Sequence, residues 1–245
     1  ADSPIYTTMN KGAITAQNCP FVSELWTIDY QLIRKCNIII DKVQSVEDII
    51  LSKDEKNRYE AEARFLRALC YFDLARTFGK APLVTYPQSL TDELKVAPSD
   101  FETLVNFIVT ECDTYAGNLE LEMTGSLAGH ATVGAFKALK ARALLYYASP
   151  LNNPSNDLTR WAKAAEAAQD VQDLNIYSLY KTGATPYYTM QFDKSDANKE
   201  YIFARRFSYP EMPHNIHMMW SLDSGDAGSW NGLYPTQNLV DAYET

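Results

Sequence analysis

The sequence contains few residues of the kinds that hold metal ions or carry covalent catalysis. Its 245 residues include four cysteines and three histidines, and no two cysteines form a Cys-x-x-Cys pair. Since zinc sites are built from closely spaced Cys and His residues, these counts give a metal site little support. The sequence also lacks a glycine-rich phosphate-binding loop and the Gly-x-Ser-x-Gly motif of serine hydrolases. We therefore expect no metal, no cofactor, and buried free thiols at Cys36 and Cys70, which lie in apolar helical patterns.

Long apolar runs and an excess of positive charge are missing as well. No apolar stretch is long enough to span a bilayer, and the first residues, Ala1 to Pro4, do not resemble the start of a signal peptide. The net charge of −9 argues against nucleic acid as a partner, because nucleic-acid-binding proteins neutralise phosphates with basic side chains. Composition alone allows a cytosolic protein, or a mature or trimmed piece of an exported one.

Helical periodicity begins at Phe21 and continues to Ile40, with apolar residues three and four positions apart. A second helix is predicted to begin at Ser52, because Glu55 three residues later completes a capping-box pattern, and to end at Gly79. Its apolar residues cover most of its circumference. We therefore expect this second helix to lie deep between its neighbours.

Further helices are indicated by their end signals. One is predicted to begin at Ser99, which forms a capping-box pattern with Glu102. The next follows Thr132 and ends at Ser149, and another contains Trp161.

Three large side chains in these helices are predicted to be structural. Arg67 lies in the mainly apolar second helix, where a charge needs a carboxylate or backbone carbonyls as partners. Trp26 and Trp161 have apolar neighbours at helical spacing, so we expect both in the core.

The order of these elements predicts a fold dominated by α-helices. Residues 63–68 and 135–141 share an alanine-rich pattern that lets helices approach closely, which favours stacked, tetratricopeptide-like helix hairpins. After Tyr180 the helical period is lost, and residues 201–207 are predicted as a strand. We therefore expect three regions: an N-terminal loop segment over 1–20, a helical region over 21–178, and an incomplete, loop-rich lobe with short strands over 179–245.

Several motifs resemble the SusD/RagB family of outer-membrane nutrient-binding lipoproteins. The second helix and the turn after it carry the most specific of them, Glu-Ala-Arg-Phe-Leu-Arg-Ala at 62–68, Tyr-Phe-Asp-Leu at 71–74 and Phe-Gly-Lys-Ala-Pro-Leu-Val at 78–84. Other matching motifs follow in the family's order: Trp26 to Asn37, Ala131 to Tyr147, Trp161 to Ala167 and Pro235 to Tyr243. The resemblance spans nearly the whole chain from Trp26 onward.

The resemblance implies a non-catalytic protein that captures oligosaccharides, or less often peptides, on the extracellular face of the outer membrane. Its implied partner is a SusC-like TonB-dependent transporter that imports the ligand. Two departures from the family pattern stand out. Cys19 lacks the preceding residues that direct lipid attachment, and family members continue well beyond Thr245. We therefore expect a fragment without the lipidated N-terminus and the C-terminal portion, whose whole protein reaches the membrane through a lipid anchor.

A candidate ligand site lies in the loop-rich region. Trp220 and Trp230 are surrounded by glycine and serine, and such rings can stack on the apolar face of a pyranose while polar groups bond its hydroxyls. The predicted ligand-binding residues are Trp220, Trp230, Asn231, Tyr234 and Asp223, with Tyr6 and Asn10 as a possible second wall. In the alternative interpretation these rings pack the loop onto the helices.

Other functions are weighed against this one. Asp223 and Asp226 are close together in the sequence, whereas glycosidase carboxylates come from separate elements across a cleft, so a glycoside hydrolase is less favoured. A helical-repeat scaffold for protein partners would account for the hairpins without any small ligand. A carboxylate-rich turn could hold calcium through oxygen ligands, although solvated side chains are the simpler interpretation; it comprises Asp193, Asp196, Asn198 and Glu200.

Overall fold

Helices make up most of the regular structure in the computed structural model, which describes residues 11–15, 18–190, 198–207, 210–213 and 237–242. The long helices are α2 (Pro20–Lys42), α3 (Lys53–Phe78), α4 (Phe101–Tyr115), α5 (Val133–Ala148) and α6 (Leu158–Gln172). Shorter elements are α7 (Pro186–Met190), α9 (Gln237–Asp241) and the 3-10 turns Val43–Ser45, Ala116–Asn118 and Gly125–Leu127. The predicted all-α-dominated class is confirmed.

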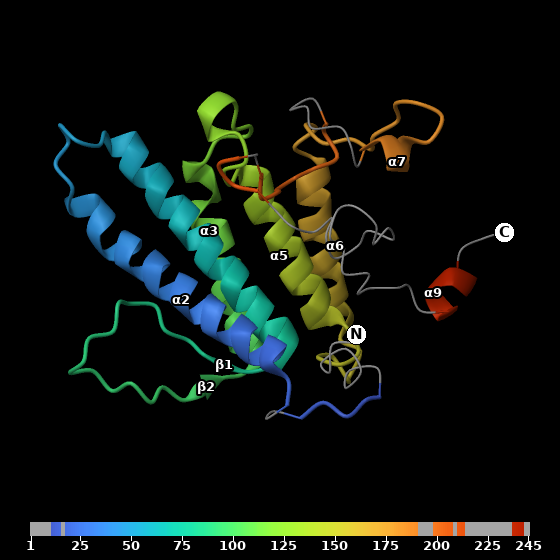
Figure 1. Ribbon diagram of the computed structural model, residues 1–245, viewed down its shortest axis with the longest axis horizontal. Coiled ribbons are helices and arrows are strands. Elements are labelled where there is room, and N and C mark those ends of the chain that lie inside the picture. Colours follow the sequence, from blue (N-terminus) through green and yellow to red (C-terminus); the bar gives the residue numbers. More distant parts are fainter. Residues whose placement is uncertain (1–10, 16–17, 191–197, 208–209, 214–236, 243–245) are drawn as a thin grey trace. The chain divides into compact units, whose positions relative to one another are not determined.

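The chain divides into two units, one formed by Leu25–Ala204 and the other by Ala1–Glu24 together with Arg205–Thr245. The first unit contains the helical stack. Within it α3 packs against α4, α4 against α5, and α5 against α6, so neighbouring helices in the sequence are neighbours in space (Figure 1). This succession is the predicted tetratricopeptide-like arrangement.

The ends of α3 are fixed by the predicted caps. The Ser52 hydroxyl accepts from the Glu55 amide at 3.3 Å, while the Glu55 carboxylate accepts from the Ser52 amide at 2.9 Å. Gly79 adopts a left-handed conformation with φ of 72°, and its amide donates to Ala75 at 2.8 Å. These caps therefore bond to backbone N–H groups at the start of α3 and a carbonyl group near its end, which would otherwise lack partners within the helix.

The predicted cap of α4 is wrong by one residue. Asp100 is the N-cap, and its carboxylate accepts from the Thr103 amide at 2.8 Å. Ser99 instead belongs to β2 (Pro98–Ser99), which pairs antiparallel with β1 (Ala81–Pro82). Because Ser99 pairs with Ala81 in this short ladder, the next residue takes the capping role.

The core of this unit centres on α3. Its side chains at Phe65, Tyr71 and Leu74 are almost completely buried, and the Phe65 ring packs edge-on against Phe136 of α5 at 5.3 Å between ring centres. Ile33 brings α2 into the same cluster. The expectation that α3 lies deep between its neighbours is confirmed.

The two tryptophans of the stack are both half-buried but differ in what they pack against. Trp26 packs at the edge of the core, where its ring meets Phe78 at 4.9 Å in an edge-on arrangement. Trp161 is half-buried and lies outside the main cluster, and its indole N–H donates to Asn156 at 3.2 Å. Its prediction as a core residue is wrong, because the indole packs beside the polar turn that precedes α6. Cys36 and Cys70 are buried free thiols, as predicted.

The strand predicted over 201–207 is not formed. These residues bend at 202–203 and have no pairing partner among the described residues. The Phe203 ring instead packs edge-on against Phe65 at 4.9 Å, and the Tyr201 hydroxyl donates to the Met190 carbonyl at 3.2 Å. Aromatic packing onto the helices thus replaces the expected ladder.

None of the helices that the structure describes combines the length and apolar character needed to cross a bilayer.

Candidate functional site

The sequence-predicted platform lies outside the described residues. This holds for every member of that set: Trp220, Trp230, Asn231, Tyr234, Asp223, Tyr6 and Asn10. The prediction of a sugar-stacking platform therefore stays a prediction, and the structure neither brings these residues together nor separates them.

The carboxylate-rich turn considered for calcium is described only in part, since Asp193 and Asp196 lie outside the described residues. Glu200 accepts from the Tyr180 amide at 2.6 Å, and the Asn198 side-chain oxygen accepts from the Glu200 amide at 3.2 Å. Both oxygens thus stabilise local backbone. Across the part of the chain that the structure describes, no group of three or more His, Cys, Asp or Glu is arranged to hold a metal ion.

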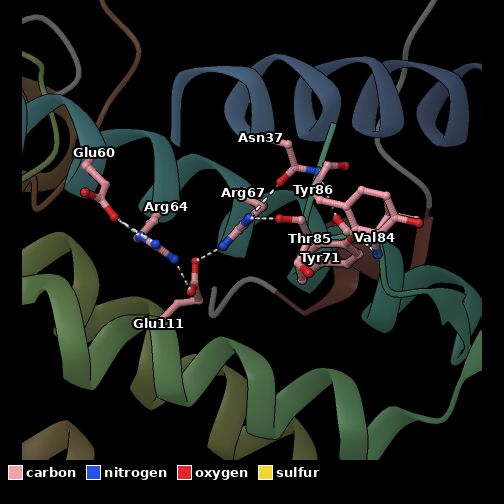
Figure 2. A network of polar contacts seen from close by, with 9 residues as sticks. All are labelled: Asn37, Glu60, Arg64, Arg67, Tyr71, Val84, Thr85, Tyr86 and Glu111. Carbon is pink, nitrogen blue, oxygen red and sulfur yellow. Dashed lines mark hydrogen bonds and ion pairs between the residues drawn. The ribbon is translucent and has the colours of Figure 1, made fainter. Parts of the chain in front are cut away.

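A buried polar network lies where α2, α3 and α4 meet (Figure 2). At its centre Arg67 is only 2% exposed, and its guanidinium donates to Asn37 at 2.7 Å and to the Thr85 carbonyl at 3.1 Å. It also donates to the Glu111 carboxylate at 2.7 Å. The carboxylate and carbonyl partners expected for Arg67 are therefore present.

The network continues along α3 as alternating charges. Glu111 accepts a second bond from Arg64 at 3.0 Å, and Arg64 in turn contacts Glu60 one turn earlier at 2.8 Å. Each buried charge thus has an opposite charge beside it, which offsets the cost of removing both from water.

The same network holds the chain segment after β1. The Tyr71 hydroxyl donates to the Val84 carbonyl at 2.9 Å and accepts from the Val84 amide at 2.7 Å. The Asn37 amide donates to the carbonyls of Val84 at 3.0 Å and of Tyr86 at 3.1 Å. Burial raises the pKa of Tyr71 to about 12, so its hydroxyl stays neutral at physiological pH. We conclude that this network positions backbone; its carboxylates are occupied by ion pairs.

A second polar feature is an open hollow at one end of the helical stack. It forms where α3 ends, α4 begins, α5 ends and α6 begins, and its volume is about 480 Å³. Aromatic and charged side chains line it together: Phe78, Lys80, Asp100, Phe101, Glu102, Tyr147, Asn152 and Arg160, with Gly79.

The polar groups of the hollow are held by contacts with one another. Arg160 donates to the Asn152 carbonyl at 2.7 Å, and its guanidinium lies 3.8 Å from the centre of the Tyr147 ring. Burial, and then a hydrogen bond to Glu102, raise the pKa of Tyr147 to about 12. The neutral Tyr147 hydroxyl therefore donates to the Glu102 carboxylate, which remains able to accept further bonds.

Sequence reasoning did not identify this hollow. In the sequence, Gly79 and Glu102 indicate helix ends, and Phe78 and Gly79 also belong to a family motif. Nothing in the linear pattern indicates that these residues meet Arg160, because that requires the packing order of four helices. The clue available was the concentration of Phe, Tyr, Asp and Lys at helix ends.

Comparison with known proteins places the chain in a family. Residues 6–145 match the SusD-like family described as "Starch-binding associating with outer membrane". A curated SusD-like protein of Bacteroides ovatus is 26% identical over 186 residues, which cover 76% of this chain and 33% of that protein.

Solved structures agree. A SusD-like protein of Bacteroides fragilis superposes with a TM-score of 0.78 at 25% identity, covering 95% of this chain and 43% of that one. A structure described as containing xylogluco-oligosaccharide gives a TM-score of 0.68 at 26% identity, covering 84% of this chain and 40% of that one. A laminarin-binding SusD-like protein gives a TM-score of 0.52 at 26% identity, and the match covers 60% of this chain and 29% of that one.

The chain spans less than half the length of each of these relatives. The family match nevertheless covers more than half of the chain and includes α2, α3 and α4 completely. The chain belongs to the SusD-like family.

Proposed function

We propose that the protein captures oligosaccharides, or less often peptides, at the cell surface for import through a TonB-dependent outer-membrane transporter. The observation that carries this proposal is membership of a family described as starch-binding and associated with the outer membrane. Two similar structures add support, since one is described as laminarin-binding and the other contains xylogluco-oligosaccharide.

The proposed ligand platform is the aromatic set from the loop-rich region. Trp220 and Trp230 would stack on sugar rings, while Asp223, Asn231 and Tyr234 would bond hydroxyl groups. Tyr6 and Asn10 are proposed as the second wall.

Binding without catalysis is part of the proposal. A glycosidase needs one carboxylic acid with a raised pKa and a second carboxylate across a cleft. Within the described hollow, Asp100 caps α4, and hydrogen bonds from Thr103 hold the pKa of its carboxyl below the usual value. The cap makes Asp100 a poor general acid, and the proposal of binding without catalysis rests on the description of the family as starch-binding.

The proposed partner is a SusC-like transporter, and the proposed location is the extracellular face of the outer membrane, where a lipid anchor would hold the whole protein. Capture of a ligand over a transporter requires a large protein interface. If the full-length protein purified from native membranes in mild detergent elutes without a large barrel protein, the partner is wrong. If protease added to whole cells leaves it intact, the location is wrong.

The platform is tested by replacing its rings. Trp220→Ala and Trp230→Ala should each weaken oligosaccharide binding about tenfold, because stacking of one sugar on one ring contributes on the order of 1–2 kcal/mol. Titration calorimetry with laminari-, xylogluco- and malto-oligosaccharides measures the change. Trp161→Phe is the matched control, since this half-buried residue belongs to the helical stack. Unchanged affinity in both single variants and in the double variant would remove the platform.

A helical scaffold for protein partners is the second candidate. Three half-exposed aliphatic side chains, Ile28, Leu32 and Ile39, follow one face of α2 at helical spacing and favour a protein contact there. Saturable binding of free sugar separates the two functions, because a scaffold would show none.

A further inference from the structure

We propose that the hollow at the end of the helical stack is a second carbohydrate site, which holds one or two neutral sugar units apart from the aromatic platform. The choice of ligand class rests on the proposed function. All residues that line the hollow belong to Leu25–Ala204, whereas every platform residue belongs to the other stretches of the chain.

The size and lining of the hollow suit a small polar ligand. Its volume of about 480 Å³ lies within the range of small-molecule sites, which is roughly 300–1,000 Å³. Half-buried aromatic side chains, Phe78, Phe101 and Tyr147, supply the apolar part of its wall. A pyranose has an apolar face that can pack on such rings, and its hydroxyls need polar partners at the same time.

Those polar partners are present and have unused bonding capacity. Arg160 carries five N–H donors, and its closest contacts are one bond to the Asn152 carbonyl and a 3.9 Å approach to Asp157. The Glu102 carboxylate accepts from Tyr147 and has further lone pairs. Donors and acceptors together are what neighbouring sugar hydroxyls require.

The charges of the hollow balance. Lys80 and Arg160 contribute two positive charges, and Asp100 and Glu102 contribute two negative charges. A ligand with a net charge of either sign would meet one favourable and one unfavourable pair. A neutral polyhydroxylated ligand can bond to all of them, so the balance favours sugar over phosphate or a cationic peptide.

The groups are also held in place before any ligand arrives. Arg160 is stacked on Tyr147, Asp100 is fixed as the cap of α4, and the Asn152 side chain donates to the Tyr146 carbonyl at 3.0 Å. Side chains that are already ordered lose little conformational entropy on binding. The hollow is therefore a preorganised site at the junction of four helix ends.

The experiment is a titration of the ¹⁵N-labelled chain with laminari-, xylogluco- and malto-oligosaccharides to millimolar concentration, followed by ¹H–¹⁵N spectra. We expect at least one oligosaccharide to shift the amide signals of Glu102 and Tyr147 and the side-chain signal of Arg160 in a saturable way. If none of the three shifts these signals, the second site does not exist.

A variant makes the test specific. Glu102→Ala should weaken the saturation seen at Tyr147 and Arg160 about tenfold, because a charged acceptor is lost. Glu166→Ala removes an exposed carboxylate from α6 and should change nothing. Arg160→Lys keeps the charge but loses the planar donor fork, and should also weaken binding. Unchanged saturation in both hollow variants, with melting temperatures showing that they fold, would overturn the assignment.

The outcome separates this site from the platform. If Trp220→Ala and Trp230→Ala abolish all binding and the hollow signals never move, the proposed function stands and the second site falls. If the hollow signals saturate as before in the tryptophan variants and the calorimetric affinity is also unchanged, the second site stands and the platform falls. If the hollow signals are unchanged but the calorimetric affinity drops, both sites stand.

Discussion

Two contacts between helices of the stack, α3 with α4 and α5 with α6, are built from different chemistry. Between α3 and α4 lies the ion pair of Arg67 and Glu111, whose side chains are 2% and 7% exposed. The pairing of α5 with α6 instead buries alanines, including Ala164, and its ion pair between Lys137 and Asp170 lies at the surface. The contact between α3 and α4 is stable only while both charges of the ion pair are present. The contact between α5 and α6 is stable only while the side chains between the two helices stay small.

The largest effect is expected at the buried pair. Glu111→Ala leaves the Arg67 guanidinium buried without its carboxylate and should lower the free energy of unfolding by about 3–5 kcal/mol. Asp170→Ala removes one half of the exposed pair and should cost less than about 1 kcal/mol. Urea unfolding followed by circular dichroism compares the two. Similar costs would mean that burial does not distinguish the two contacts.

A double replacement sharpens this result. Arg67→Met combined with Glu111→Leu removes both charges, so no unpaired group is left in the core. The double variant should be more stable than Glu111→Ala alone. If it is less stable, the pair contributes more through its bonds to Asn37 and Thr85 than through charge.

The contact between α5 and α6 should be destabilised by a larger side chain, whereas the contact between α3 and α4 is destabilised by removal of a charge. Ala164 is 5% exposed, and Ala164→Leu forces extra atoms into a close helix contact, at a cost of about 1–3 kcal/mol. The neighbouring Ala165 is exposed and provides the matched control. Ala165→Leu should leave the melting temperature nearly unchanged. Equal destabilisation by both would show that helix α6 does not rely on small residues at its buried face.

The smallest effect concerns a buried carboxyl between α2 and α3. Burial, and then the charge of Asp73, raise the pKa of Asp29 to about 6, and its Oδ2 has no hydrogen-bond partner among the described residues. Because the folded pKa lies above the unfolded one, stability should fall as the pH rises from about 4 to about 6. Arg76 and the Cys70 thiol act in the opposite direction on the pKa.

The test is Asp29→Asn, which removes this titration. The variant should be more stable than the natural chain by about 1–2 kcal/mol near pH 7.5, and the difference should shrink as the pH falls toward about 4. Unfolding curves at several pH values give this difference directly. A difference that does not change with pH would mean that Asp29 titrates normally.

Helix ends were predictable because their signals are local. Ser52 and Glu55 satisfy each other within one turn, so the sequence alone was enough to place the start of α3. The predicted start of α4 is one residue too early, because Ser99 and Asp100 can both cap a helix. Which of them does so depends on the pairing of β2 with β1, which the local sequence does not show. The strand predicted over 201–207 failed for the same kind of reason, since a strand needs a partner that local sequence does not reveal.

The buried polar network and the hollow also combine a part that the sequence predicts with a part that only the fold shows. A partner for Arg67 could be expected from its place in an apolar helix, but the identity of that partner, Glu111, could not. The hollow was missed because its lining comes from four helix ends, and each residue has an ordinary local explanation. Patterns within one helix are readable from sequence, whereas contacts between helices depend on the fold.

Saturable binding of a free oligosaccharide, measured together with the release of reducing ends, tests the central claim most directly. The chain is incubated with laminari-, xylogluco- and malto-oligosaccharides, binding is followed by titration calorimetry, and new reducing ends are counted in the same samples. A SusD-like capture protein predicts saturable binding of at least one oligosaccharide with no increase in reducing ends over the protein-free sample. Release of reducing ends in proportion to protein concentration, or no binding to any of the three, would contradict the account.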